Sequence, residues 1–91
     1  MAIRFLWDQN KSRLNKAKRG VSFEEAQAVF SREIAGGIRN EDPEQHYSIG
    51  FASNGVFVTV IYEFRRDDAG LYIWVVTLWK TTKEEKRRIP K

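Results

Sequence analysis

Few side chains in this sequence suit acid–base chemistry, whereas many suit contacts with phosphate groups or nucleobases. His46 is the only histidine, and histidine is the side chain whose unperturbed pKa fits proton transfer near neutral pH. Lysine and arginine bind phosphate, and aromatic rings can stack unpaired bases. The aromatic candidates for stacking are Trp74, Trp79, Tyr47, Tyr62 and Phe64. Each group also has an ordinary explanation, since single histidines are often inert and most aromatic rings belong to cores.

The composition excludes several classes of site. Without cysteine the chain can form no disulfide, no thiolate zinc site and no cysteine nucleophile, and one histidine cannot build a multi-histidine metal cluster. We therefore expect a protein without metal or other cofactor. No apolar run approaches the ~20 residues that span a bilayer, and the first residues do not form a signal peptide. These patterns predict a cytoplasmic protein that does not enter membranes.

The net charge of +4 is unevenly distributed along the chain. Residues 1–20 carry six Lys/Arg and one Asp, and residues 80–91 carry six Lys/Arg and two Glu, whereas residues 21–79 carry four basic and nine acidic side chains. If the two basic ends meet on one side of the fold, they form a surface suited to phosphates. Solvated, purely solubilising faces are the alternative explanation.

The elements that must position these residues centre on the segment from Tyr47 to Trp79. Apolar side chains alternate within 47–52 and 56–64, and 71–79 is rich in β-branched and aromatic residues, as is typical of strands. Asn54-Gly55 predicts a tight type I′ turn between the first two strands, and the polar residues 65–70 predict a longer turn before the third. These patterns together predict an antiparallel meander.

Residues 1–46 predict two helices between short strands. Residues 3–7 alternate as a first strand, Asp8 is a candidate N-cap for a helix over 9–18, and Gly20 is placed to end it. That helix offers only Leu14 and Ala17 for burial. Residues 33–38 predict a weak edge strand, and 39–45 predict a polar connection.

Two capping boxes mark further helix starts. Ser22 with Glu25 begins a helix whose apolar positions 23, 26, 29 and 30 should face the sheet, and Thr82 with Glu85 begins a short basic helix through about Arg88. The result is one α+β domain over residues 1–91. It has a short N-terminal strand, two helices, an antiparallel meander of three to four strands and a short basic C-terminal helix.

Three segments, in this order, resemble one protein family over nearly the whole chain. They are Phe5-Leu6-Trp7-Asp8 with Asn15, Lys18 and Gly20; Gly20-Val21-Ser22-Phe23-Glu24-Glu25-Ala26; and Lys80-Thr81-Thr82-Lys83-Glu84-Glu85-Lys86-Arg87. The combination is similar to the BrnT family of type II toxins, also called DUF497. The resemblance implies a RelE-like fold and a ribonuclease that inhibits translation. It also implies neutralisation by a BrnA-like antitoxin, and binding of operator DNA only through that antitoxin.

RNA cleavage without metal needs a base for the 2′-hydroxyl, an acid for the leaving 5′-oxygen and cations for the crowded phosphorane. On this resemblance His46 is the candidate acid or base, and Arg65 and Lys80 are candidates to bind the scissile phosphate. The candidate contacts to the RNA backbone are Lys16, Lys18, Arg19 and Lys83.

The sequence departs from the family pattern at several polar positions. The pattern has Arg at the start of the first meander strand, Glu-Arg after the tyrosine of the second, Arg at the end of the third, and His after the lysine of the first helix. This sequence has His46, Phe64 with Arg65, Trp79 and Arg19 at these places. Because aromatic residues replace charged ones, a catalytically inactive toxin fold that binds protein is the alternative function. A third hypothesis is a simple nucleic-acid-binding module.

The last predicted strand alternates apolar residues on both of its faces. Two helices and a short tail can cover one face of a small sheet, so Ile73, Val75 and Trp79 are expected to remain exposed on the other. We therefore expect the isolated chain to form a homodimer or to bind a partner helix there.

Overall fold

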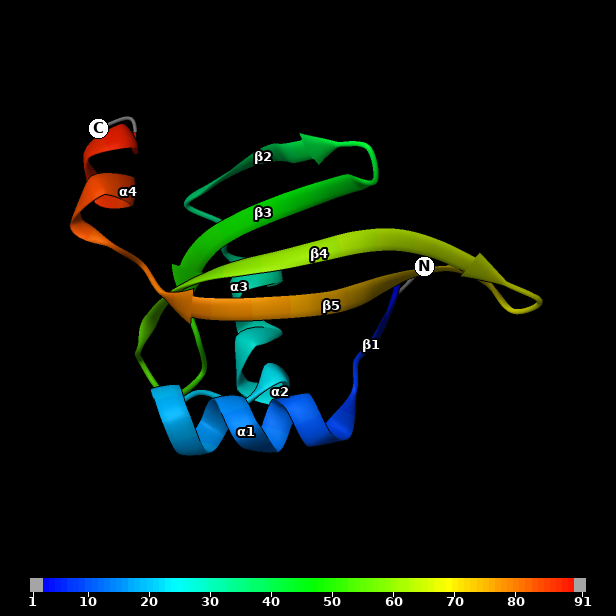
Figure 1. Ribbon diagram of the computed structural model, residues 1–91, viewed down its shortest axis with the longest axis horizontal. Helices are drawn as coiled ribbons and strands as arrows, with labels where there is room; N and C mark the ends of the chain where they lie inside the picture. Colours follow the sequence, from blue (N-terminus) through cyan, green and yellow to red (C-terminus); the bar gives the residue numbers. More distant parts are fainter. Residues whose placement is uncertain (1–2, 90–91) are drawn as a thin grey trace.

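The computed structural model describes residues 3–89, in which five strands form one mixed sheet in the order β1-β5-β4-β3-β2 (Figure 1). The strands are β1 (Arg4–Leu6), β2 (Ala35–Glu41), β3 (Glu44–Phe51), β4 (Phe57–Asp67) and β5 (Gly70–Lys80). Strands β2 to β5 form the predicted antiparallel meander, and β1 pairs with β5 in parallel. The meander thus has four antiparallel strands, and the predicted N-terminal strand adds a fifth, parallel strand at one edge of the sheet.

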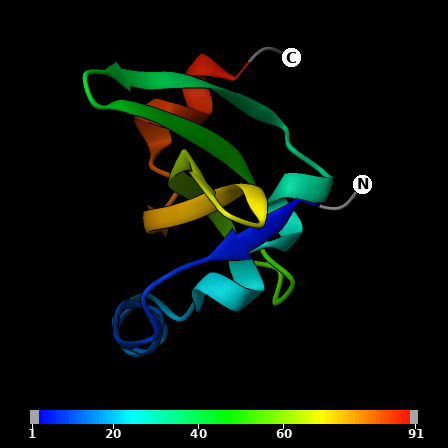
Figure 2. The same cartoon turned by 90° about the vertical axis from the view of Figure 1, so that its right-hand side faces the viewer.

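Helices cover one face of this sheet and border the other. The helices are α1 (Gln9–Arg19), α2 (Phe23–Ala26), α3 (Ala28–Ser31) and α4 (Lys83–Arg88). In Figure 1 α3 lies behind β4 and β5 and α2 lies below it, between the sheet and α1, and in Figure 2 α1 lies at the bottom, below β1 and β5. We call the face that packs on α2 and α3 the inner face, and the opposite one the outer face.

The helix boundaries follow the capping residues. Asp8 accepts hydrogen bonds from the backbone N–H groups of residues 10 and 11, and Gly20 ends α1 in the left-handed region with φ 78°. Both capping boxes form, Ser22 with Glu25 and Thr82 with Glu85. These predictions are confirmed. The helix expected after Ser22 is divided at residue 27 into α2 and α3.

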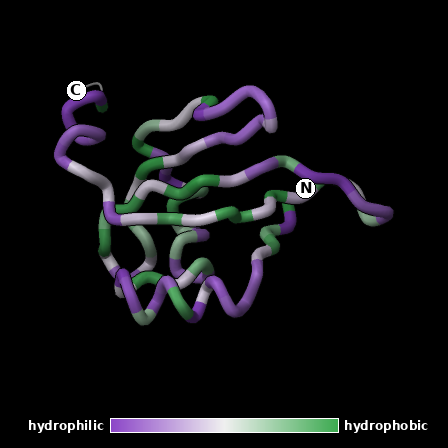
Figure 3. The backbone as a smooth tube through the Cα atoms, viewed as in Figure 1, coloured by the Kyte–Doolittle hydropathy of each residue, from purple (hydrophilic) through white to green (hydrophobic). Residues whose placement is uncertain are grey.

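The core lies between the inner face and the short helices. Phe23, Ala26 and Val29 from the helices are fully buried against Val58, Val60, Val75 and Leu78 of the sheet. In Figure 3 the hydrophobic colour follows the middle of the strands and α2–α3, whereas the hydrophilic colour dominates α1, α4 and the tip of the β4–β5 hairpin. The predicted apolar face of residues 23, 26 and 29 is confirmed.

Helix α1 buries polar side chains, which corrects the expectation that Leu14 and Ala17 would be its buried positions. Leu14 is 56% exposed and Ala17 is exposed, whereas Ser12 and Asn15 are buried. Ser12 Oγ accepts a hydrogen bond of 2.9 Å from the backbone N–H of Phe23, and Asn15 Nδ2 donates to the carbonyl of Lys11. The helix therefore docks by hydrogen bonding to the start of α2.

Ser12→Ala is expected to lower the free energy of unfolding by about 1–3 kcal/mol, because the buried N–H of Phe23 loses its acceptor. Urea unfolding measures this change as a shift of the midpoint at constant slope. Ser31→Ala is the matched control, because its hydroxyl bonds a carbonyl at an exposed position. Equal midpoints for the two variants would contradict the role of Ser12.

Two connections differ from their predicted forms. Among the described residues only glycines have positive φ, so Asn54 does not adopt the type I′ turn; in this connection the left-handed residue is Gly55, with φ 88°. Its N–H donates to the carbonyl of Ala52, whose own N–H donates to the carbonyl of Val56, so residues 53–55 form the loop within the connection 52–56. Strands β4 and β5 extend to Asp67 and Gly70 through the expected turn, and β2 and β3 extend through most of the expected polar connection at 39–45.

A β-bulge in β5 changes which residues face the core. Ile61 pairs with Thr77 and Tyr62 pairs with Val75, so Val76 is an extra residue on β5. As a result Ile73, Val75 and Leu78 all join the core, while Trp74 and Trp79 lie on the outer face. The exposed patch expected from Ile73, Val75 and Trp79 is therefore wrong, since the first two are 6% and 1% exposed.

Candidate nucleic-acid interface

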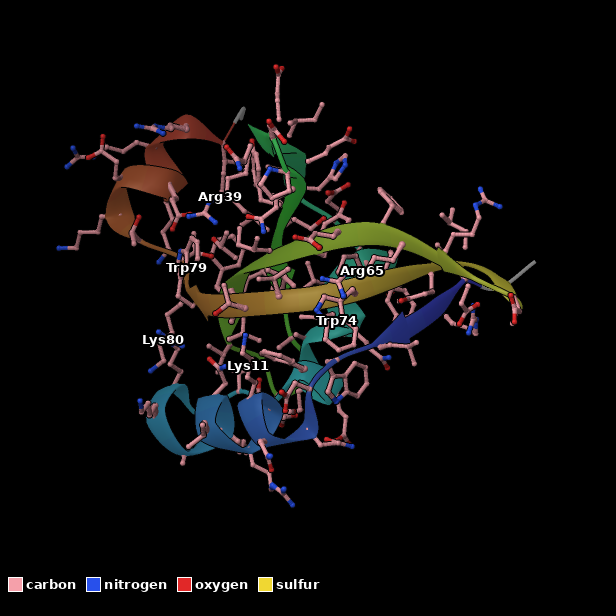
Figure 4. All side chains as sticks on the ribbon, turned by 45° about the vertical axis from the view of Figure 1, so that its right-hand side comes forward. Lys11, Arg39, Arg65, Trp74, Trp79 and Lys80 are labelled. Atoms are coloured by element: carbon pink, nitrogen blue, oxygen red, sulfur yellow. The ribbon has the colours of Figure 1, made fainter. Side chains whose placement is uncertain are left out.

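The outer face carries an alternating set of polar and aromatic side chains that the strand register brings together. Residues paired across neighbouring strands share a face, so Glu63 of β4 and Trp74 of β5 lie in one row, and Gln45 of β3 joins it through a hydrogen bond to Glu63. A second row, four residues toward α4 on β4, contains Ile49, Thr59 and Trp79. Figure 4 labels Arg65 beside Trp74 and Arg39 beside Trp79 on this side of the molecule.

The first row forms a charged cluster around Arg65. Its guanidinium donates from Nε and Nη2 to Glu63 Oε1, at 3.1 and 2.8 Å, and lies over the indole of Trp74, 4.8 Å from the ring centroid. Gln45 Nε2 donates to the other Glu63 oxygen at 2.8 Å. The carboxylate and the indole thus hold the guanidinium in place. The Arg65 side chain is still 44% exposed, so a phosphate can reach it.

Hydrogen bonds from Gln45 and Arg65 hold the pKa of the Glu63 carboxyl below its ordinary value. A lowered pKa in the folded state stabilises the fold above the ordinary glutamate pKa, and this contribution is lost as the pH falls through the lowered value. Glu63→Gln is therefore expected to flatten the fall in unfolding free energy below about pH 4. Urea titrations at several pH values measure this slope, with Asp68→Asn, an exposed carboxyl in the β4–β5 turn, as the control. Identical slopes for wild type and Glu63→Gln would contradict the assignment.

The second row opens into a groove of about 330 Å³ between the sheet and α4. Ile38, Arg39, Tyr47, Ile49, Thr59, Trp79, Glu85 and Arg88 line it. The Arg39 guanidinium lies 5.4 Å from the centroid of the Trp79 ring, and the Trp79 indole N–H donates to Glu85 Oε1 at 2.9 Å. The groove therefore combines an aromatic plane, a phenol and two guanidinium groups.

Glu85, in the first turn of α4, contributes a carboxylate to this groove. Its partial burial favours the neutral acid, but donors from Thr82 and Trp79 outweigh this and lower the pKa of the Glu85 carboxyl. The carboxylate thus closes the capping box and orients Trp79 at the same time. Glu63 and Glu85 are therefore both bonded by donors of the protein, which reduces their repulsion of a phosphate chain.

The three predicted catalytic residues do not converge. His46 lies on the inner face, where its ring stacks on Tyr62 with centroids 5.5 Å apart and its Nε2 is 2.8 Å from Glu44 Oε1. Arg65 lies on the outer face, because it follows Tyr62 by three residues in the same strand. Lys80 is exposed at the end of β5, on the side of α1 in Figure 4. The three residues therefore do not form one catalytic centre.

The predicted RNA-binding cations divide into separate groups. Lys16 Nζ contacts both carboxylate oxygens of Glu25, at 2.8 and 3.0 Å, and thereby ties α1 to α2. Lys18 and Arg19 line a groove of about 260 Å³ between α1 and β5, together with Lys11, Leu14, Asn15, Val76 and Thr77. Lys83 is exposed in the first turn of α4. Only Lys18 and Arg19 are brought together.

Several residues of the interface escaped prediction from sequence. Lys11 and Arg88 look like solvated charges in the sequence, and Arg39 reaches Trp79 from an irregular position in β2, where the register shifts between residues 38 and 40. Glu63 had a usable signal, because Glu63 and Arg65 are two residues apart in a strand and must share a face.

Within residues 3–89 no three His, Cys, Asp or Glu side chains gather closely enough to hold a metal ion. None of the helices in that part of the chain is long and apolar enough to cross a membrane.

Comparison with known proteins gives one family. Residues 7–85 match the family described as ribonuclease toxin, BrnT, of type II toxin-antitoxin system. A search of curated proteins found no match. The family match extends from the end of the first strand segment into α4, so it includes both rows of the outer face. The chain therefore belongs to the BrnT family of ribonuclease toxins of type II toxin–antitoxin systems.

Proposed function

We propose that this protein is a metal-independent ribonuclease that inhibits translation in the cytoplasm and that a BrnA-like antitoxin neutralises. The operator DNA of such a system would be bound only through the antitoxin. Membership of the BrnT family supports the ribonuclease assignment. The observation that carries its location is the cluster of Glu63, Arg65 and Trp74 on the outer face, because it joins a carboxylate, a guanidinium and an aromatic plane.

In this proposal Glu63 takes the proton from the 2′-hydroxyl as its oxygen attacks phosphorus. A glutamate side chain is ionised at neutral pH, so the Glu63 carboxylate can accept this proton. Arg65 stabilises the negative charge of the phosphorane, and the bond to the 5′-oxygen breaks to leave a 2′,3′-cyclic phosphate. Tyr47, two residues from Gln45 on the same face of β3, is the candidate to protonate the leaving 5′-oxygen. His46 and Lys80 keep their predicted roles as separate hypotheses, each to be tested by alanine replacement.

Induction of the protein in bacteria without an antitoxin tests the proposal. Growth arrest and cleaved mRNA are expected for the wild type, and Glu63→Gln is expected to relieve both at equal protein levels. Normal growth with intact mRNA at confirmed wild-type expression would refute the ribonuclease. If the Glu63→Gln variant arrested growth as strongly as the wild type, only the role of Glu63 would be refuted, and the ribonuclease assignment would stand.

A catalytically inactive binding protein is the second candidate. Trp79, one residue before the end of β5, stands where the family pattern has arginine, and His46 is separated from Arg65 by the sheet. Purified protein that binds RNA or antitoxin but leaves single-stranded RNA intact would favour this candidate. Cleavage that disappears in the Glu63→Gln variant would exclude it.

The surface for self-association or for the antitoxin is a proposal as well. With Val75 and Ile73 buried, the apolar side chains still exposed near the tip of the inner face are Phe64 and Leu71, at 46% and 43%. We place the contact of a homodimer or of the antitoxin there. Light scattering should report two chains per particle, and Phe64→Lys should return it to one. A wild-type monomer whose Phe64→Lys variant binds antitoxin normally would contradict this placement.

A further inference from the structure

The outer face holds two copies of one arrangement, an indole with a guanidinium over it. Arg65 lies over Trp74 and Arg39 lies over Trp79, at 4.8 and 5.4 Å from the ring centroids. We propose that these two platforms each stack one unpaired nucleobase, so that the protein binds RNA as a single strand across the outer face. The inference rests on the proposed function, since it names the form of RNA which that face recognises.

Each platform has the parts that single-stranded recognition requires. Base stacking on an aromatic or guanidinium plane does not depend on sequence, and the N–H edge of the guanidinium remains available to a phosphate. Neither Trp74 nor Trp79 is fully buried, and Arg39 and Arg65 are exposed. The carboxylates beside them are already bonded, Glu63 by Arg65 and Glu85 by Trp79.

The spacing of the platforms excludes a paired, stacked helix as the ligand. Trp74 and Trp79 are five residues apart on β5, with the bulge at Val76 between them, which places them about 15 Å apart at the usual rise of a strand. The bases inside an RNA duplex are stacked on their neighbours and leave no free face for a platform. The space between the platforms is occupied by Ile61 and Thr77, which carry no charge. An extended single strand can cross this space and present one base at each end.

Tryptophan fluorescence tests the inference directly. The titrant is a 2′-O-methyl RNA oligonucleotide of about ten nucleotides, which lacks the attacking hydroxyl and cannot be cleaved, given either alone or annealed to its complement. The single strand should quench the emission and bind more tightly than the duplex. Trp74→Leu and Trp79→Leu should each weaken binding roughly 5- to 100-fold, the range for loss of one stacked base.

Trp7→Phe is the matched control, because Trp7 packs against the core cluster and its indole N–H donates to Gln9. Its affinity should equal that of the wild type. Because Trp79 also bonds Glu85 of α4, Arg39→Gln is the second variant at that platform and leaves this hydrogen bond in place. It should weaken single-strand binding and reduce the slope of log affinity against log salt concentration by about one, the value for one phosphate contact.

The outcomes separate this inference from the proposed ribonuclease. The inference is refuted if the duplex binds as tightly as the single strand. It is also refuted if Trp74→Leu, Trp79→Leu and Arg39→Gln all bind the single strand with wild-type affinity. Cleavage of unmodified RNA is measured separately. Weaker single-strand binding by the variants, with no cleavage by the wild type, supports the platforms and refutes the ribonuclease. Cleavage by the wild type, with unchanged affinity in the variants, supports the ribonuclease and refutes the platforms.

Discussion

An Arg65→Lys variant is expected to cleave RNA on the order of 100-fold more slowly than the wild type, with its fold unchanged. The guanidinium donates two hydrogen bonds to Glu63 while it lies over Trp74, and a single ammonium cannot keep both contacts and still face a phosphate. Removal of one preorganised donor at a developing oxyanion typically costs this much rate. Single-turnover cleavage of a labelled RNA measures the effect.

Arg66→Lys is the control for that measurement. Arg66 is the next residue in β4, is exposed as Arg65 is, and points to the opposite face because side chains alternate along a strand. Its cleavage rate should match that of the wild type. If Arg66→Lys were the slower variant, the scissile phosphate would lie on the inner face, beside His46.

Phe23→Ala is expected to lower the free energy of unfolding by about 3–5 kcal/mol, a large part of the ~5–15 kcal/mol typical of a domain. Phe23 is fully buried, and its backbone N–H is the one bonded by Ser12. The cavity would open between α2 and the inner face, where α1 docks as well. Phe51→Ala, at a position 55% exposed, is the control and should change stability far less. Urea midpoints of the two variants within measurement error of each other would contradict this account of the core.

Local signals in the sequence were sufficient for most of the fold. Asp8 and Gly20 determine the ends of α1 because each satisfies backbone groups of the adjacent turn, and the two capping boxes do the same for α2 and α4. Alternation identified β3 and β4, since one face of each strand must be apolar to meet the helices, and a run of β-branched and aromatic residues identified β5. Such signals act within a few residues, so they remain visible without knowledge of tertiary contacts.

The errors arose where distant segments decide the outcome. Nothing local shows that Ser12 would be buried, because its partner is the backbone of Phe23, eleven residues away. Alternation alone assigned Val75 and Trp79 to one face of β5, and the bulge at Val76 reversed the second half of the strand. The side of the sheet on which a residue lies depends on such irregularities.

The candidate site was harder to predict than the fold for the same reason. Arg65 was identified from its position, but its contacts with Glu63 and Trp74 depend on the register of three strands. Arg39 and Trp79 are forty residues apart and meet only because β2 folds back beside α4. His46 is chemically the most suggestive residue, yet its strand directs it toward Tyr62 on the inner face.

The attachment of α4 has a consequence for the motion of the groove. This helix of six residues buries none of its side chains, and its contacts with the sheet include the Trp79–Glu85 hydrogen bond and Lys86 over the Phe57 ring. A unit with so little buried surface opens by itself far more often than the whole domain unfolds. Its amide protons should exchange with solvent well before those of β4. Because Glu85 and Arg88 leave with α4, the width of the groove fluctuates on the timescale of this local opening. A nucleotide bound in the groove would therefore slow the amide exchange of α4 more than that of any other element.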